Sequence, residues 1–325
     1  MNSEKINTQS TSDNPTTSGV SPNTPKTHQK AGGKSMDLKQ EITNKIIALM
    51  ENEESEFRER WRKVITTGGL PYNARTSKYY NGINVLLLNI EKAEKGYVSN
   101  AWMTYRQALE LGGHVRKGEK GIVGVYFQTI TKETELKDDE DVVSYPMMKS
   151  FVLFNAEQVD GLDKEKLGIA EKIIEKDSFV PIEEAEAIIK ATGATFSFGH
   201  QEAGYIAIRD RILMPEKEAF YSQEMYYLTA FHELVHWTGH ESRLNRNFSG
   251  RFGGAAYAFE ELIAEIGAAF LGAVLGFSED LMPDHAQYVK SWIQILKNDK
   301  SAIFTASNRA SKAFDYILKR EAANT

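Results

Sequence analysis

Residues 221–239 read YSQEMYYLTAFHELVHWTG and contain an H-E-x-x-H pattern. Apolar side chains recur in this stretch at helical spacing, and Gly239 is a typical helix-stop residue. Residues four apart share one face of a helix, so the imidazoles of His232 and His236 can converge on one metal ion. The carboxylate of Glu233 would lie beside that ion, where it can take a proton from water. The pattern predicts a metal site on a helix, with Glu233 as the catalytic base.

A second helix, expected over residues 255–272, carries three carboxylates among apolar residues. An unpaired carboxylate costs several kcal/mol to bury, and a bound metal ion would offset that cost. Glu261 and Glu265 lie four residues apart on one helix face. One of them can bind the metal while the other holds a ligand histidine by its second ring nitrogen. Glu260 is expected to be a solvated helix residue.

Three residues compete to be the third ligand. The long metzincin motif needs a histidine at position 242, where this chain has Ser242. His240 follows the expected end of the helix, and a histidine at such a place is more often exposed. Glu261 fits best, because its pairing with Glu265 resembles the gluzincins, in which the first acidic residue of an E-x-x-x-D pattern is the third ligand. Two histidines, one carboxylate and an open position are typical of a catalytic zinc site, so one zinc ion is the expected cofactor.

Length and composition are those of a chain that can form two domains with cores of their own. The chain has 325 residues, a net charge of −6 and no cysteine, which excludes disulfides and thiolate metal sites. Its longest apolar run, residues 267–277, is too short to span a bilayer. We expect a cytoplasmic protein without a membrane partner. It would have a disordered polar tail (1–36), a DNA-binding domain (37–160) and a metallopeptidase domain (161–325).

Charge is distributed unevenly along the chain. Residues 58–120 contain twelve basic and five acidic side chains, whereas residues 151–325 carry a net charge of −8. Such asymmetry suggests that the N-terminal region meets a polyanion. A solvated surface without a partner is the alternative explanation of the charge count alone.

Aromatic, amide and basic residues alternate in two stretches of this N-terminal region, 69–88 and 102–121. Single-stranded nucleic acid needs this mixture, because bases stack on rings for about 1–3 kcal/mol each while cations follow the phosphates. The competing interpretation is a core helix at 85–90 surrounded by satisfied tyrosines. No recognition-helix or zinc-finger pattern favours duplex DNA. The candidate DNA contacts are Arg75, Lys78, Tyr79, Tyr80, Asn81, Asn84, Trp102, Tyr105, Arg106, His114, Arg116, Lys117 and Lys120.

The remaining patterns predict an α+β fold. An N-terminal α+β domain would contain a helix at 37–64, a short helix opening at 102 and strands at 122–130 and 148–154. A mainly helical domain would follow, with a helix beginning near 181, a small sheet from strands at 195–198, 205–208 and 211–214, the two metal helices, and closing helices at 283–297 and 301–319. A small sheet beside an active-site helix is the usual layout of the zincin fold.

Six blocks in one order resemble the ArdC family of plasmid antirestriction proteins, and the N-terminal region is also similar to conjugative primases. The blocks are GLPYNARTSKYYNGINVLLL, TYRQALELGGHVRKGEKG, FNAEQVDGL, FHELVHWTGHESRL, GRFGGAAYAFEELIAEIGAAFL and SWIQILKNDKSAIFTASNRASKAFDYIL. The resemblance implies a single-stranded-DNA-binding domain followed by a zincin-like metallopeptidase domain. His232, Glu233 and His236 match the metal-and-base motif, and Glu261 matches the acidic ligand. The family role it implies is protection of mobile DNA from restriction endonucleases in a new host.

Two departures and two alternative functions stay open. Residues 57–61 read FRERW where relatives tend to carry a Pro-Trp pair, and the polar tail is extended. The chain could be a non-catalytic DNA-binding protein that keeps its metal for folding. It could also be a free-standing zinc peptidase that acts on a protein partner, such as a host defence protein. Tyr257 and His240 are two candidates to stabilise an oxyanion.

Overall fold

The computed structural model describes residues 32–51, 69–133, 142–163, 182–220, 222–246, 254–277 and 286–319. The predicted tail up to residue 31, the FRERW segment at 57–61 and the second half of the helix predicted at 37–64 lie outside these residues. The first half of that helix is present as α1 (Gly32–Glu51), which begins five residues earlier than expected.

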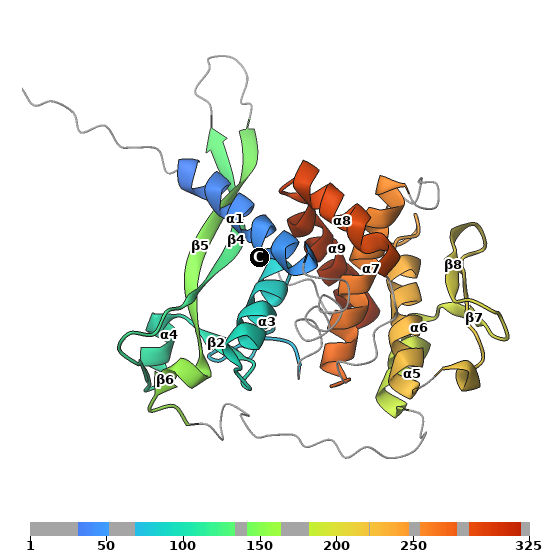
Figure 1. Cartoon of the computed structure of the whole chain (residues 1–325), viewed down its shortest axis with the longest axis horizontal. Helices are drawn as coiled ribbons and strands as arrows, with labels where there is room; N and C mark the ends of the chain where they lie inside the picture. Colours follow the sequence, from blue (N-terminus) through green and yellow to red (C-terminus); the bar gives the residue numbers. More distant parts are fainter. Residues whose placement is uncertain are drawn as a thin grey trace, which may run out of the picture.

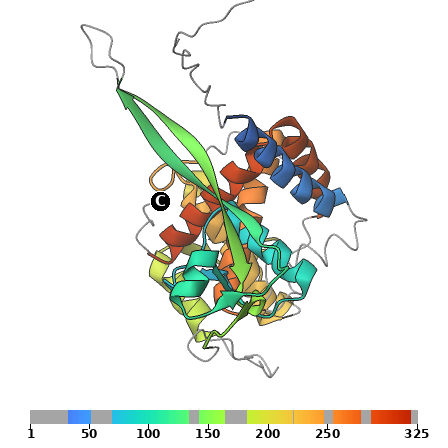
Figure 2. The ribbon, with the colours of Figure 1, turned by 90° about the vertical axis from the view of Figure 1, so that its left-hand side faces the viewer.

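The N-terminal half is built around a long two-stranded ribbon. Strands β4 (Ile122–Glu133) and β5 (Val142–Asn155) pair antiparallel with Ile122 opposite Leu153, and Figure 2 shows them extending away from the body of the molecule. Strand β5 also pairs with β2 (Ala101–Met103), which pairs with β1 (Tyr72–Asn73), so the sheet order is β1-β2-β5-β4. A separate pair joins β3 (His114–Val115) to β6 (Val159–Asp160).

Two helices accompany this sheet. Residues 83–90 of helix α3 (Ile83–Lys95) are buried, so the alternative interpretation of 85–90 as a core helix is confirmed. Helix α4 (Tyr105–Glu110) begins after a capping box made by Thr104 and Gln107. The prediction that Trp102 opens this helix was wrong, because Trp102 lies in strand β2. The reciprocal hydrogen bonds of the capping box fix the helix start at the following residues.

The C-terminal half is mainly helical, as predicted. Helix α5 (Glu183–Thr192) leads into a three-stranded sheet with the order β7-β9-β8, and Figure 1 shows this sheet beside α6. Its strands are β7 (Thr195–Ser197), β8 (Gly204–Ile206) and β9 (Arg211–Leu213). Helices α6 (Gln223–Thr238), α7 (Ala255–Val274), α8 (Ala286–Asn298) and α9 (Ala302–Ile317) complete it.

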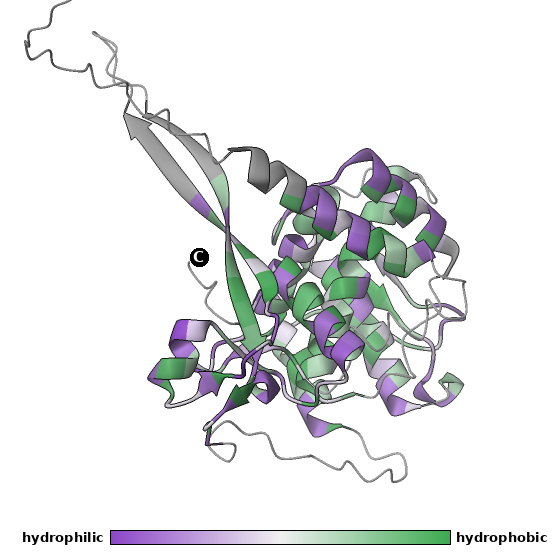
Figure 3. Ribbon diagram, turned by 60° about the vertical axis from the view of Figure 1, so that its left-hand side comes forward, coloured by the Kyte–Doolittle hydropathy of each residue, from purple (hydrophilic) through white to green (hydrophobic). Residues whose placement is uncertain are grey.

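One hydrophobic core runs through both halves. It includes Ile46 of α1 and Leu86 of α3 together with Trp292 of α8 and Phe314 of α9. Figure 3 shows hydrophobic residues concentrated on the helices at the centre. No helix among the described residues is long and apolar enough to cross a membrane.

Glycine allows α6 and α7 to approach closely near the histidines. A Cβ on Gly267 would lie 2.7 Å from Val235 Cγ2, and a Cβ on Gly272 would lie 2.6 Å from Leu228 Cδ2. Both distances are far below van der Waals contact, so only glycine fits without a shift of the helices. This close packing positions the two helices that carry the predicted site.

Candidate metal centre and basic surface

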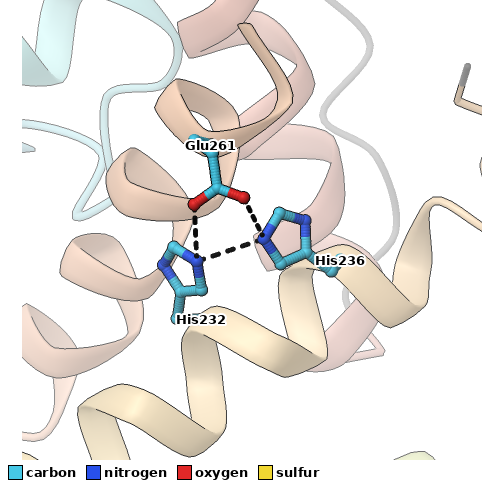
Figure 4. A group of neighbouring side chains, drawn as sticks. All are labelled: His232, His236 and Glu261. Carbon is cyan, nitrogen blue, oxygen red and sulfur yellow. Dashed lines mark hydrogen bonds and ion pairs between the residues drawn. The ribbon is translucent and has the colours of Figure 1, made fainter. Parts of the chain in front are cut away.

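The predicted metal-binding side chains converge between α6 and α7. His232 and His236 lie on α6 and Glu261 lies on α7, all three are buried, and their ligand atoms lie within 4.8 Å of one another. Figure 4 shows the Nε2 atoms of both imidazoles facing the Glu261 carboxylate. The two Nε2 atoms are 3.1 Å apart. Nε2 of His232 lies 3.5 Å from Oε2 of Glu261, and Nε2 of His236 lies 3.4 Å from Oε1 of Glu261.

These spacings are close to those around a tetrahedral metal: the two imidazole–carboxylate distances fall in the expected range, and the 3.1 Å between the imidazole nitrogens is slightly shorter. Ligand atoms about 2.0–2.2 Å from zinc, at tetrahedral angles, are separated by about 3.3–3.6 Å. The donor set of two imidazoles and one carboxylate also suits a divalent ion that keeps an open position for water. The residues therefore fit the metal that the motif predicts.

Electrostatics at the cluster favour a bound positive charge. Burial alone would raise the pKa of Glu261, but hydrogen bonds from His232 and His236 hold it well below its ordinary value. Burial would lower the pKa of His236, but its hydrogen bonds to Glu260 and Glu261 raise it to about 10. The same carboxylates that hold a proton on His236 would attract a metal cation in its place.

Two further predicted residues lie at the cluster. Glu233 is buried next to His232 on α6, and its negative charge contributes to the raised pKa of His236. Glu265 lies one turn after Glu261, and its Oε2 is 3.8 Å from Nδ1 of His232. Glu265 therefore lies at the second ring nitrogen of His232, as its predicted role requires, and the charge of Glu233 reaches His236.

The prediction that Glu260 is solvated was wrong. Glu260 is only 4 % exposed, and its Oε1 lies 3.3 Å from Nδ1 of His236. Its carboxylate also accepts hydrogen bonds from Arg246, which is itself buried. Burial would raise the pKa of Glu260, but its contacts with His236 and Arg246 lower it. Residues 260–273 of α7 are all buried, so this part of the helix has no solvated face for Glu260.

The two candidates for oxyanion stabilisation are placed differently. Burial raises the pKa of Tyr257, and a hydrogen bond with Glu261 and a second with Tyr288 act in the same direction, so its phenol stays protonated. His240 lies outside the cluster, with its Nδ1 2.8 Å from the Oγ of Ser242. Tyr257 is therefore the candidate that contacts the predicted metal ligands.

The predicted DNA-contacting residues divide by exposure. Tyr80 and Asn81 are half-buried. Asn84 is buried, and its side chain exchanges hydrogen bonds of 2.7 and 2.9 Å with the backbone of Val125 in β4. Trp102 is fully buried. Burial removes Asn84 and Trp102 from the surface, which corrects their assignment as contacts. The exposed members are Arg75, Lys78, Tyr79, Tyr105, Arg106, His114, Arg116, Lys117 and Lys120.

A glutamate joins two parts of this exposed set. Arg75, in the loop after β1, and Arg106, on α4, both pair with Glu110 at 2.7 and 3.1 Å. Tyr79 and Tyr105 are 45 % and 53 % exposed on the same two segments. We call this group (Arg75, Lys78, Tyr79, Tyr105, Arg106) the basic surface. The basic surface has a net positive charge, because its two arginines and one lysine outnumber the single carboxylate of Glu110.

Comparison with known proteins connects both halves to one family. Residues 36–154 match the N-terminal domain of anti-restriction factor ArdC, and residues 183–309 match a zincin-like metallopeptidase family. The crystal structure of the antirestriction ArdC protein from plasmid R388, in its metal-free form, superimposes with a TM-score of 0.71. It is 41 % identical, over 87 % of this chain and 97 % of that one. The chain belongs to the ArdC antirestriction family.

A second ArdC structure and two further relatives extend this relation. The Mn(II)-bound structure of the R388 protein superimposes with a TM-score of 0.70, at 40 % identity over 89 % of this chain and all of that one. Protein y4eC of Sinorhizobium fredii (strain NBRC 101917 / NGR234) is 34 % identical over 86 % of this chain and 91 % of its own length. DNA primase TraC of Escherichia coli is 36 % identical over 87 % of this chain, which spans 27 % of the primase.

The ArdC relation confirms the predicted fold. Its zincin-like match and the Mn(II)-bound relative, together with the three convergent buried side chains, also support a divalent metal in this chain.

Proposed function

We propose that this ArdC-family protein binds single-stranded DNA through its N-terminal domain and a zinc ion through its C-terminal domain. In this role it would protect DNA of a mobile element from restriction in the cytoplasm of a new host. The observation that carries the metal half is the buried convergence of His232, His236 and Glu261 beside Glu233. We place the two domains at 37–160 and 161–325, after a polar tail.

The metal half would perform peptide hydrolysis. An ion held by His232, His236 and Glu261 would act as a Lewis acid toward a peptide carbonyl and toward water. Glu233 would take the proton from the attacking water and pass it to the leaving amine. Glu265 would hold the ring of His232 by Nδ1. The protonated phenol of Tyr257 would donate to Glu261 and keep one carboxylate oxygen aimed at the histidines.

The DNA half rests on the basic surface. Its cations would follow the phosphates of a single strand, and Tyr79 and Tyr105 would stack on bases, because both rings are exposed. His114, Arg116, Lys117 and Lys120 would extend this path. Arg116 pairs with Glu119 at 2.6 Å, as Arg75 and Arg106 pair with Glu110, so each of these arginines should contribute less than a lysine without such a contact.

Metal analysis of protein purified without a polyhistidine tag tests the metal half. We expect about one divalent ion per chain in the wild type and none in His236→Ala. Equal metal content in both proteins would reject the site.

Binding of a labelled single-stranded oligonucleotide tests the DNA half. We expect the affinity to fall as salt rises, and Arg106→Ala to reduce the slope against salt by about 0.7. Lys190→Ala is the control, because Lys190 is exposed on α5, which lies at the other end of the molecule from α4 (Figure 1). An affinity that responds to neither salt nor Arg106→Ala would reject the proposed surface.

A further inference from the structure

Arg246 makes a fork of hydrogen bonds that joins the two metal helices. Its Nε lies 3.1 Å from both oxygens of Glu260 on α7, and its Nη2 lies 2.8 Å from Glu260 Oε1. The same guanidinium donates to the end of α6, with Nη2 2.5 Å from the carbonyl oxygen of Val235 and Nη1 2.8 Å from Oγ1 of Thr238. The planar guanidinium has five donors in a fixed geometry, so it can hold both helices at once.

Glu260 passes this constraint to a predicted metal ligand. Its Oε1, which accepts from Arg246, also faces Nδ1 of His236 at 3.3 Å. A carboxylate at Nδ1 places the imidazole hydrogen on that nitrogen and leaves the lone pair on Nε2. Nε2 of His236 is the atom that faces Glu261 and His232.

From these contacts we infer that Arg246 is a positioning residue, which acts through Glu260 to fix the ring and the tautomer of His236 for metal binding. This inference rests on the proposed metal site and adds to it two residues that the H-E-x-x-H and E-x-x-x-E patterns do not contain. The bonds to Val235 and Thr238 reach only the end of α6, whereas the bond to Glu260 leads directly to the ring of His236, and we infer that this second route acts on the metal.

Arg243 provides a matched control on the same turn. Its Nε donates to the carbonyl oxygen of Trp237 at the end of α6, and its guanidinium pairs with Asp210. Arg243 is thus a mostly buried arginine that caps α6 and pairs with a carboxylate, as Arg246 does. The difference is the carboxylate, because Glu260 lies 3.3 Å from Nδ1 of His236, whereas Asp210 pairs with Arg243 and Tyr205. Replacing either arginine should reduce stability, but only Arg246 should affect the metal.

The experiment compares zinc affinity in full-length protein by competition with a chelator. We expect Arg246→Met and Glu260→Gln each to weaken zinc binding by about 10–100-fold, with Arg243→Met within about twofold of the wild type. Arg246→Lys should fall between the wild type and Arg246→Met, because an ammonium keeps the charge without the fork. The absorption spectrum of the Co(II)-substituted protein should change in the Arg246 and Glu260 variants and stay unchanged in Arg243→Met.

The double variant Arg246→Met/Glu260→Gln tells whether Arg246 affects zinc binding through Glu260 or through a general loss of structure. If Arg246 acts through Glu260, adding Arg246→Met to Glu260→Gln should change zinc affinity by less than about threefold. Fully additive losses, or a wild-type affinity and Co(II) spectrum in Arg246→Lys and Glu260→Gln, would overturn the inference. Circular dichroism checks that each variant is folded. If Arg246→Met is unfolded, the zinc affinities of Arg246→Lys and Glu260→Gln still test the inference.

Failure of the inference and failure of the metal site give different results. If His236→Ala loses zinc while Glu260→Gln and Arg246→Lys keep full affinity, the metal site stands and the inference falls. If the wild type and His236→Ala bind zinc equally, the proposed metal site itself is wrong.

Discussion

The metal centre and the basic surface differ in how the chain specifies them. At the metal centre, the side chains come from two helices, are buried, and are braced by further buried groups such as Arg246. On the basic surface, the side chains come from a loop and a short helix, are exposed, and pair with a shared carboxylate. The buried metal site can be predicted from the sequence because helix periodicity places its ligands on one face. The exposed basic surface cannot, because its residues come from segments that meet only in the folded protein.

Glu233→Gln should give the largest effect and isolates the chemistry of the buried region. The amide cannot accept the proton from water, so hydrolysis should fall by about 10²–10⁴-fold while the metal stays bound. Cleavage of a random peptide library, read by mass spectrometry, measures the activity, and metal analysis checks occupancy. Cleavage at the wild-type rate, or a wild type that cuts no peptide, would contradict the proposed hydrolysis.

Gly267→Ala tests whether close helix packing sets the buried geometry. The added methyl group would overlap Val235, next to His236, and should destabilise the protein by about 1–3 kcal/mol. Gly204→Ala is the control, because a Cβ there meets nothing within 4 Å. Denaturant unfolding measures stability, and equal stabilities for the two variants would show that the contact between α6 and α7 is not tight.

Tyr105→Leu tests whether a base stacks on the exposed ring of the basic surface. Loss of one stacked base should weaken single-stranded DNA binding by about 1–3 kcal/mol without changing zinc content. Tyr316→Leu, at a ring 40 % exposed on α9, should leave DNA binding unchanged. If Tyr105→Leu has no effect and Tyr126→Leu on the ribbon does, the DNA path runs along β4 and not over the basic surface.

The Tm of the metal-free protein should fall by a few degrees as pH rises, whereas the Tm of the zinc-loaded protein should stay nearly constant. The pKa of His236 is raised from its ordinary 6.5 to about 10 in the fold. A raised pKa stabilises the folded state fully below about pH 6.5, and this stabilisation is lost as pH rises toward 10. Metal-free protein should therefore lose Tm across this window, and zinc should suppress the loss because it replaces the proton. A metal-free Tm that rises with pH here would contradict the electrostatics of the cluster.

The sequence predicts the metal centre well because its signals are local. Spacing along a helix places His232 over His236, and the next helix supplies Glu261. Spacing alone does not reveal that Glu260 is buried, because the packing of α6, α8 and α9 around α7 closes the face on which it lies. Arg246 could not be found from spacing, since its contact with Glu260 depends on how the chain turns between the helices.

On the basic surface, composition alone could not separate exposed from buried residues. Trp102 and Tyr105 are three residues apart and equally plausible as stacking rings in the sequence. In the fold, strand β2 carries Trp102 into a core with Leu88 and Leu153, and the capping box turns Tyr105 outward. The pairing of Arg75 with Glu110 likewise joins segments that only the tertiary structure brings together.

Anomalous diffraction at the zinc edge, from crystals grown with zinc, is the most direct test of the metal centre. We expect one peak between α6 and α7, about 2.0–2.2 Å from Nε2 of His232, Nε2 of His236 and an oxygen of Glu261. A fully occupied zinc ion elsewhere in the chain, with these three side chains not coordinating metal, would contradict it.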